Sequence, residues 1–156
     1  MADYFLKVDG ISGESRDSKH KDEIELVSFS WGVSQSGQAG RGGGAGRAQF
    51  KSFEFLMKVN KASPQLFLAC ASGKHLKEAS LSVRRAGKAA LEYLKIKFTD
   101  VLVSSYDAAG GEDEAPHEMV AFNFGRIELA YTSQDPRGAA GATIQAGWDL
   151  KANKKV

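Results

Sequence analysis

The chain has 156 residues, of which 42% are hydrophobic and 26% charged, and its formal net charge is +2. This length fits one domain spanning 1–156. The near-neutral charge gives no support for a nucleic-acid partner or an anionic membrane surface. The only cysteine, Cys70, excludes an intrachain disulfide and favours folding in a reducing compartment.

The N-terminus lacks the charged and apolar regions of a cleavable signal peptide. No uninterrupted apolar run approaches the roughly 18 residues that indicate a membrane-spanning helix. We therefore expect a protein that assembles in the cytoplasm and that, if exported, leaves without the ordinary signal.

A period of two in the hydrophobic pattern predicts that most of the chain is β-strand. A short strand at 4–8 is followed by a charged segment, 11–23, that we expect to be an exposed loop. Two longer strands then flank an extended glycine-rich loop, 36–47, within the stretch 24–59. Further strands are expected at 76–83, 90–106, 119–131 and 144–150, which makes about seven in total.

Connections in the second half follow from composition. Residues 107–116 hold two glycines and four acids, which predicts a mobile acidic loop. The apolar phase changes at Gly125, which predicts a β-bulge or a bend. A second glycine-rich loop is expected at 135–141, and residues 151–156 are expected to form a flexible tail.

One short helix is expected after the first strands. Ser63 as a cap, Pro64 at the first helical position and Gly73 just past the end form a strong helix signature. The helix is apolar on most of its surface, so we expect it to pack on a sheet with Cys70 in the packing. The alternative, a nucleophilic Cys70 paired with His75, needs an electropositive and partly exposed setting.

Strands with one short helix fit a β-barrel or packed antiparallel sheets plugged by the helix. The large apolar residues that we assign to the core are Phe29, Trp31, Phe53, Phe55, Leu66, Phe67, Phe122, Phe124 and Trp148.

Motifs for catalysis or cofactor binding are weak. Residues 40–45 formally match a dinucleotide-binding pattern, but a strand follows them where that pattern needs a helix N-terminus. The three histidines show no zinc-binding spacing. Clustered acids could pair for acid/base work or bind calcium, although a solvated surface is the commoner role. These acids are Glu112, Asp113, Glu114 and Glu118.

A serine–histidine–acid triad formed in the fold stays open, although no G-x-S-x-G elbow marks one. The sequence therefore predicts no catalytic, cofactor or metal site. Long strands with exposed edges and an extended glycine arm instead favour self-assembly.

Six sequence blocks occur in the same order as in one known family. They are 3–11 with 13–15, 28–32 with 34–37, 63–64, 70–75, 101–105 and 147–150. In these blocks the chain resembles the haemolysin-coregulated proteins (Hcp), the tube subunits of type VI secretion systems. The resemblance runs from end to end, and the departures lie in the acidic segment and before the last strand.

This resemblance implies a partly open β-barrel of two packed antiparallel sheets with one short α-helix, as in phage tail-tube proteins. It implies that six copies form a ring and that rings stack head-to-tail into a tube inside a contractile sheath. A spike-tip protein would cap the tube, and small effectors would travel in its lumen. The partners expected are thus further copies of the chain, sheath, spike tip and effectors, with no nucleic acid and no membrane insertion. Secretion would follow cytoplasmic assembly.

A ring with rotational symmetry needs contacts between two different faces of each subunit. We expect the loop 36–47 to reach the adjacent ring through Gln38, Gly40, Arg41, Gly42, Gly43, Gly44, Gly46 and Arg47. The small polar face formed by Ser28, Ser30 and Ser34, with Gly32, is the expected lumen lining, because small hydroxyls bind varied cargo weakly. The alternative for these serines is an ordinary solvent face. The alternatives for the protein are a monomeric β-rich binding module and an enzyme.

Overall fold

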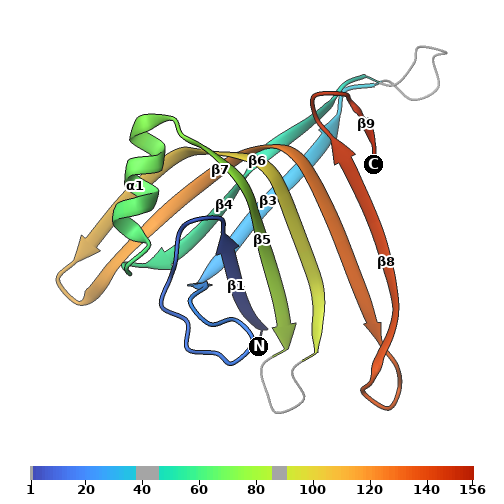
Figure 1. The fold of residues 1–156 in the computed structure, drawn as a ribbon, viewed down its shortest axis with the longest axis horizontal. Helices are drawn as coiled ribbons and strands as arrows, with labels where there is room; N and C mark the ends of the chain where they lie inside the picture. Colours follow the sequence, from blue (N-terminus) through green and yellow to red (C-terminus); the bar gives the residue numbers. More distant parts are fainter. Residues whose placement is uncertain (1, 38–45, 86–90) are drawn as a thin grey trace.

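Alternating apolar and polar side chains produce a mainly β fold, with one short helix among the residues that the structure describes (Figure 1). The structure is a computed structural model that describes residues 2–37, 46–85 and 91–156. Its helix is α1 (Ser63–Ser72). Its strands are β1 (Ala2–Val8), β2 (Ile24–Leu26), β3 (Ser28–Gln35), β4 (Ala48–Lys58), β5 (His75–Arg85), β6 (Glu92–Gly111), β7 (Glu114–Gln134), β8 (Ala140–Asp149) and β9 (Lys154–Lys155).

All strand pairs are antiparallel, and the main path of the sheet is β2-β1-β5-β6-β7-β4-β3. The end strands β2 and β3 are joined by Val27 alone, and the Val27 amide donates to Leu56 of β4 at 2.8 Å. The sheet must therefore curve back on itself, which confirms the expected partly open barrel. Within the described residues, no helix is long and apolar enough to cross a membrane.

Strand β7 is where the sheet divides. One side of β7 pairs with β6, whereas the other pairs with β4 through 117–122 and with β8 through 126–134. Strand β8 thereby leaves the barrel on the side away from α1 (Figure 1). This fork matters for function because β8 has only a short partner, β9, on its other side.

The core is built around fully buried phenylalanines. Phe53 lies 4.7 Å from Phe98 between ring centroids, and Phe55 lies 5.2 Å from Phe122 in an edge-to-face arrangement. Most of the predicted core residues are buried, and Phe29, Trp31 and Trp148 are half-buried against the cluster. Edge-to-face and offset ring pairs of this kind add to the free energy gained from burial alone.

The predicted phase change at Gly125 is confirmed, but its cause is not a bulge in β7. The β6–β7 register runs unbroken from Leu94↔Tyr131 to Val103↔Phe122. Asp100, opposite Gly125, has a left-handed φ of 56°. In both strands the other set of alternate residues is buried beyond this point. A Cβ on Gly125 would approach the Asp100 Cβ to 3.3 Å, so the glycine allows the close contact.

Two segments that the composition assigned to irregular structure are strands. Residues 107–116 were predicted to be a loop, but they continue the β6–β7 hairpin, with Asp107 paired to Met119 and Gly111 to Glu114. The predicted flexible tail carries β9 and is held to β8 by the Val156 amide, which donates to Gly147 at 3.2 Å. Backbone pairing with a neighbouring strand overrides weak local β-propensity in both places.

The charged segment 11–23 is also not the exposed loop that its composition predicts. Ile11, Gly13, Ser15 and His20 are buried in it, because the segment folds back onto the sheet. Its buried histidine contacts residues that lie far away in the sequence.

Helix α1 differs from the prediction at its cap and on one face. Ala62 occupies the N-cap position without a side-chain cap bond. The Ser63 hydroxyl instead donates to the buried carboxylate of Glu118 at 2.5 Å. Phe67, predicted to be in the core, is 56% exposed, because only one side of the helix packs and Phe67 lies off that side. The expected packing role of Cys70 is confirmed, since Cys70 lies half-buried against the core cluster.

Candidate functional site

The predicted serine face exists as a continuous surface on β3. Ser28, Ser30 and Ser34 are all exposed, while Phe29 and Trp31 point to the opposite, core side. The pairing of β3 with β4 shifts between Ser30 and Gly32, where β4 carries one extra residue. That bulge leaves the alternation of β3 intact, so the three serines share one face.

Strand β4 extends this face with larger polar groups. Gln49 lies opposite Ser34, Lys51 opposite Gly32 and Glu54 opposite Ser30, and all three side chains are exposed. Lys51 and Glu54 were not predicted to belong to this face. The alternation of exposed polar residues along β4 was the signal that could have found them.

Two edges of the sheet have backbone groups free for a further strand. Among the residues that the structure describes, β3 pairs only with β4, and β8 from Ala140 to Ala146 pairs only with β7. An open edge presents a row of N–H and C=O groups that another chain can continue. These two edges lie on different branches of the fork at β7 (Figure 1).

An exposed apolar pair lies beside the β8 edge. Ile144 of β8 is 71% exposed, and its cross-strand partner Tyr131 of β7 is 48% exposed. Tyr131 is also opposite Leu94 of β6, so three apolar side chains form a row on the core-facing side of the sheet. The row lies beyond the end of the core. Among the described residues, no element packs over Ile144 and Tyr131 closely enough to bury them.

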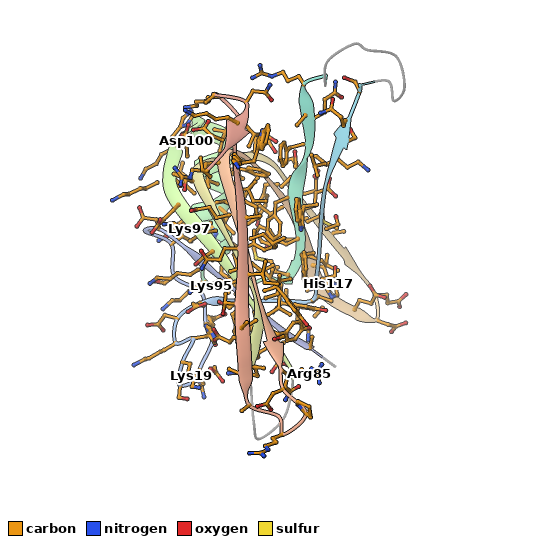
Figure 2. The ribbon with its side chains drawn as sticks, turned by 90° about the vertical axis from the view of Figure 1, so that its right-hand side faces the viewer. Lys19, Arg85, Lys95, Lys97, Asp100 and His117 are labelled. Atoms are coloured by element: carbon orange, nitrogen blue, oxygen red, sulfur yellow. The ribbon has the colours of Figure 1, made fainter. Side chains whose placement is uncertain are left out.

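The reverse face of the same strands is charged. Lys95 and Lys97 of β6 project together from this face (Figure 2), and Lys97 pairs with Glu78 at 3.3 Å. Gln145 of β8 lies in the same row as Lys95, because both are opposite Ala130 of β7. Ile144 and Gln145, which are adjacent in β8, thus lie on opposite faces of the sheet, one apolar and one charged.

Only the flanks of the predicted stacking loop fall in the described ranges. Gln38, Gly40, Arg41, Gly42, Gly43 and Gly44 lie outside the described residues. Arg47 is exposed, and its Nη2 donates to the Leu150 carbonyl at 3.0 Å. A Cβ on Gly46 would lie 2.3 Å from the Ser36 hydroxyl, so this glycine allows the flanks to approach closely. The paired strand ends Gln35 and Ala48 thus lie next to the C-terminal turn, residues 150–153.

A small ionic cluster holds that turn. The Lys151 ammonium donates to Asp100 at 2.6 Å, and His75 Nδ1 lies 2.9 Å from the other carboxylate oxygen (Figure 2 labels Asp100). The hydrogen bonds from Lys151 and then from His75 lower the pKa of Asp100, and the pKa of Lys151 is raised by Asp100. His75 is therefore bonded to Asp100 and not to the Cys70 thiol.

The predicted acidic cluster is divided by the fold. Glu118 is buried on Ser63, whereas Glu112, Asp113 and Glu114 are exposed at the tip of the β6–β7 hairpin. The structure therefore does not bring Glu118 together with the other three as a carboxylate pair.

Comparison with known proteins agrees with this architecture. The sequence model of the family described as "Type VI secretion system effector, Hcp" matches residues 5–131. The chain belongs to the Hcp family. It is 40% identical to the protein hcp1 of Pseudomonas aeruginosa, across 97% of this chain and 96% of that one.

Solved structures of Hcp-family proteins share the fold at full length. Hcp1 from Salmonella typhimurium is 42% identical with a TM-score of 0.86, and 99% of each chain is covered. A type VI secretion system effector from Yersinia pestis is 37% identical with a TM-score of 0.79, covering 94% of this chain and 99% of its own. The protein is thus an Hcp-family protein of the type VI secretion system, a family of secreted structural proteins.

Proposed function

We propose that this Hcp-family protein is the subunit of the inner tube of a type VI secretion system. Six copies close into a ring, rings stack head-to-tail, and sheath contraction exports the tube behind a spike-tip protein. The observation that carries the proposal is the pair of open strand edges on β3 and β8, with the apolar pair Ile144 and Tyr131 beside one of them.

Ring closure by rotation requires two different, complementary surfaces on each subunit. The open β8 edge of one copy and the β3 branch of the next copy are two such surfaces. Joining would pair the open backbone groups of β8 and bury Ile144, whose exposure is unfavourable in a free subunit. Both effects favour assembly over a monomeric binding module.

The serine face of β3 is our proposed lumen lining for small effectors. Ser28, Ser30 and Ser34 offer hydroxyls that can donate and accept, and Lys51 and Glu54 on β4 place both charges beside them. A surface with small hydroxyls and balanced charge binds many cargoes weakly and releases them. The loop 36–47 is the proposed contact to the adjacent ring, since its flanking strands end beside the C-terminal turn.

Negative-stain microscopy tests ring formation and stacking separately. Purified protein should form rings, and at high concentration the rings should stack. Deletion of residues 40–46 should preserve the rings and reduce stacking. Stacks of unchanged length in the deletion variant would reject the loop's role, and an absence of rings in the intact protein would reject the tube proposal.

A further inference from the structure

Phe5 is buried apart from the main core. Its neighbours Tyr4 and Leu6 belong to or pack against the core cluster, whereas Phe5, at 3% exposure, does not. The segment 11–23 covers it: the His20 ring stacks on Phe5 at 4.4 Å with an interplanar angle of 9°. The Arg84 guanidinium also lies over the Phe5 ring, 4.8 Å from its centroid. This segment therefore seals an apolar side chain on the outer side of β1.

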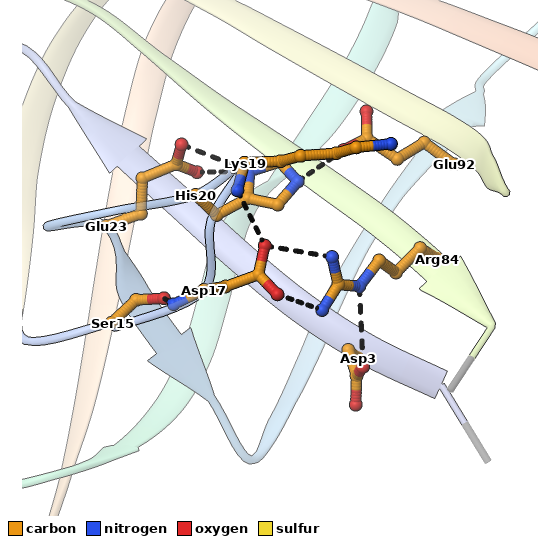
Figure 3. A network of polar contacts seen from close by, with 8 residues as sticks. All are labelled: Asp3, Ser15, Asp17, Lys19, His20, Glu23, Arg84 and Glu92. Carbon is orange, nitrogen blue, oxygen red and sulfur yellow. Dashed lines mark hydrogen bonds and ion pairs between the residues drawn. The ribbon is translucent and has the colours of Figure 1, made fainter. Parts of the chain in front are cut away.

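His20 is held between two carboxylates (Figure 3). Its Nδ1 lies 3.1 Å from both carboxylate oxygens of Glu23, and its Nε2 contacts Glu92 at the start of β6. A carboxylate only accepts hydrogen bonds, and a neutral imidazole has a single N–H to donate. Only the imidazolium, with two N–H groups, satisfies both contacts.

The charged groups that surround this histidine come from four elements. They are Asp17, Lys19 and Glu23 of the segment itself, Asp3 of β1, Arg84 of β5 and Glu92 of β6. Arg84 pairs with Asp17 through both guanidinium amines, at 2.9 and 2.5 Å. The hydrogen bond from Arg84 is the main reason that the pKa of Asp17 is lowered. The Arg84–Asp17 contact thus stays in place over the range where a histidine changes charge.

The segment is also bonded to itself, so it behaves as one ordered unit. These are backbone bonds: the Gly13 amide donates to the Asp22 carbonyl at 2.7 Å, the Ser15 amide to the Glu23 carbonyl at 3.0 Å, and the Asp22 amide to the Ser15 carbonyl at 2.9 Å. A Cβ on Gly13 would lie 2.5 Å from the Glu23 carbonyl oxygen, which explains the glycine there. Loss of the contact to Glu92 would therefore weaken these internal bonds together.

We propose that His20 is a proton-dependent clasp that holds the 11–23 segment over Phe5 by joining Glu23 to Glu92 of β6. While the imidazole carries both protons, the clasp is closed. As pH rises and one proton is lost, one nitrogen faces a carboxylate as acceptor against acceptor, and that contact becomes repulsive. The segment then opens more often and exposes Phe5 and the adjacent strand.

Amide hydrogen exchange of the full-length protein tests the clasp at about pH 6 and about pH 8, corrected for the intrinsic exchange rates. Protection of the Gly13, Ser15 and Asp22 amides should fall by at least roughly tenfold at the higher pH, the lower end of the range for one lost charge-assisted hydrogen bond. The same protection at both pH values would overturn the proposal.

The Glu92→Gln variant separates a clasp from simple packing. A glutamine side-chain amide can donate to neutral His20, so the segment should stay closed at both pH values and lose its pH dependence. His75→Gln is the matched control, because His75 also contacts a carboxylate but is exposed, and it should exchange like the unmodified protein. A Glu92→Gln segment that opens at high pH as before, or that is open at both pH values, would overturn the proposal.

Discussion

Ile144→Lys should abolish or strongly weaken self-association without unfolding the subunit. Ile144 is 71% exposed in the free chain, and its complete burial would be worth about 1.5–3 kcal/mol. The exposed part therefore contributes roughly 1–2 kcal/mol at each contact, or about a five- to thirty-fold change in association. A ring that repeats the contact multiplies this loss, and a lysine adds the cost of a buried charge.

Sedimentation velocity across a dilution series measures the effect, and thermal unfolding checks the fold. The variant should sediment as a monomer at concentrations at which we expect the unmodified protein to form rings, and its free energy of unfolding should change by less than about 0.5 kcal/mol. Gln145→Lys is the matched control, because it adds the same charge at the adjacent β8 position, on the face of the sheet where Lys95 of β6 lies. An Ile144→Lys protein that assembles with unchanged concentration dependence would show that Ile144 is not part of the assembly contact.

Three further predictions concern stability. Phe53→Ala removes a fully buried ring that lies 4.7 Å from Phe98, and it should lower the free energy of unfolding in urea by about 3–5 kcal/mol; a loss below about 1 kcal/mol would contradict the core described above. Ser63→Ala leaves the buried Glu118 carboxylate without its hydroxyl donor and should cost about 1.5–3 kcal/mol by the same measurement, whereas a neutral effect would show that this bond is not formed. Asp17→Asn should lower the melting temperature at neutral pH. Because the folded-state pKa of Asp17 is lowered by Arg84, its stabilisation is present above the unfolded value of about 3.9 and is lost as pH falls through the folded value. The melting curves of the two proteins should therefore converge in acid, and a difference that is independent of pH would argue against the Arg84 pair.

Local periodicity predicted the strands and the serine face because both depend on alternation within one strand. The alternation at Ser28, Ser30 and Ser34 is visible in the sequence, and their exposure follows once Phe29 and Trp31 pack on the other side. The helix at 63–72 could likewise be predicted, since a proline lies at its start and a glycine follows its end.

Features that depend on distant partners could not be read from the chain. Residues 107–116 have a loop-like composition, and only the pairing of 107–111 with 114–119 makes them part of a hairpin. His20 contacts Glu92 far along the chain, so its burial has no local signal. Phe67 touches only the edge of the Tyr106 ring of β6 and stays more than half exposed, which the helix sequence does not show.

The exposure of Ile144 and Tyr131 in the candidate assembly surface could not be predicted from the sequence either. Ile144 and Tyr131 have an ordinary strand alternation, which predicts burial against a core. Their exposure arises because β8 leaves the barrel at the β7 fork and extends past the core. The sequence could place Ile144 on a strand, but it could not show that a core-facing side chain lacks a core.

Native mass spectrometry of the unmodified full-length protein tests ring formation most directly. We expect a dominant species with about six times the 16.8 kDa mass of one chain, and loss of that species in Ile144→Lys but not in Gln145→Lys. A protein that remains at 16.8 kDa across the whole accessible concentration range would contradict the proposed tube subunit.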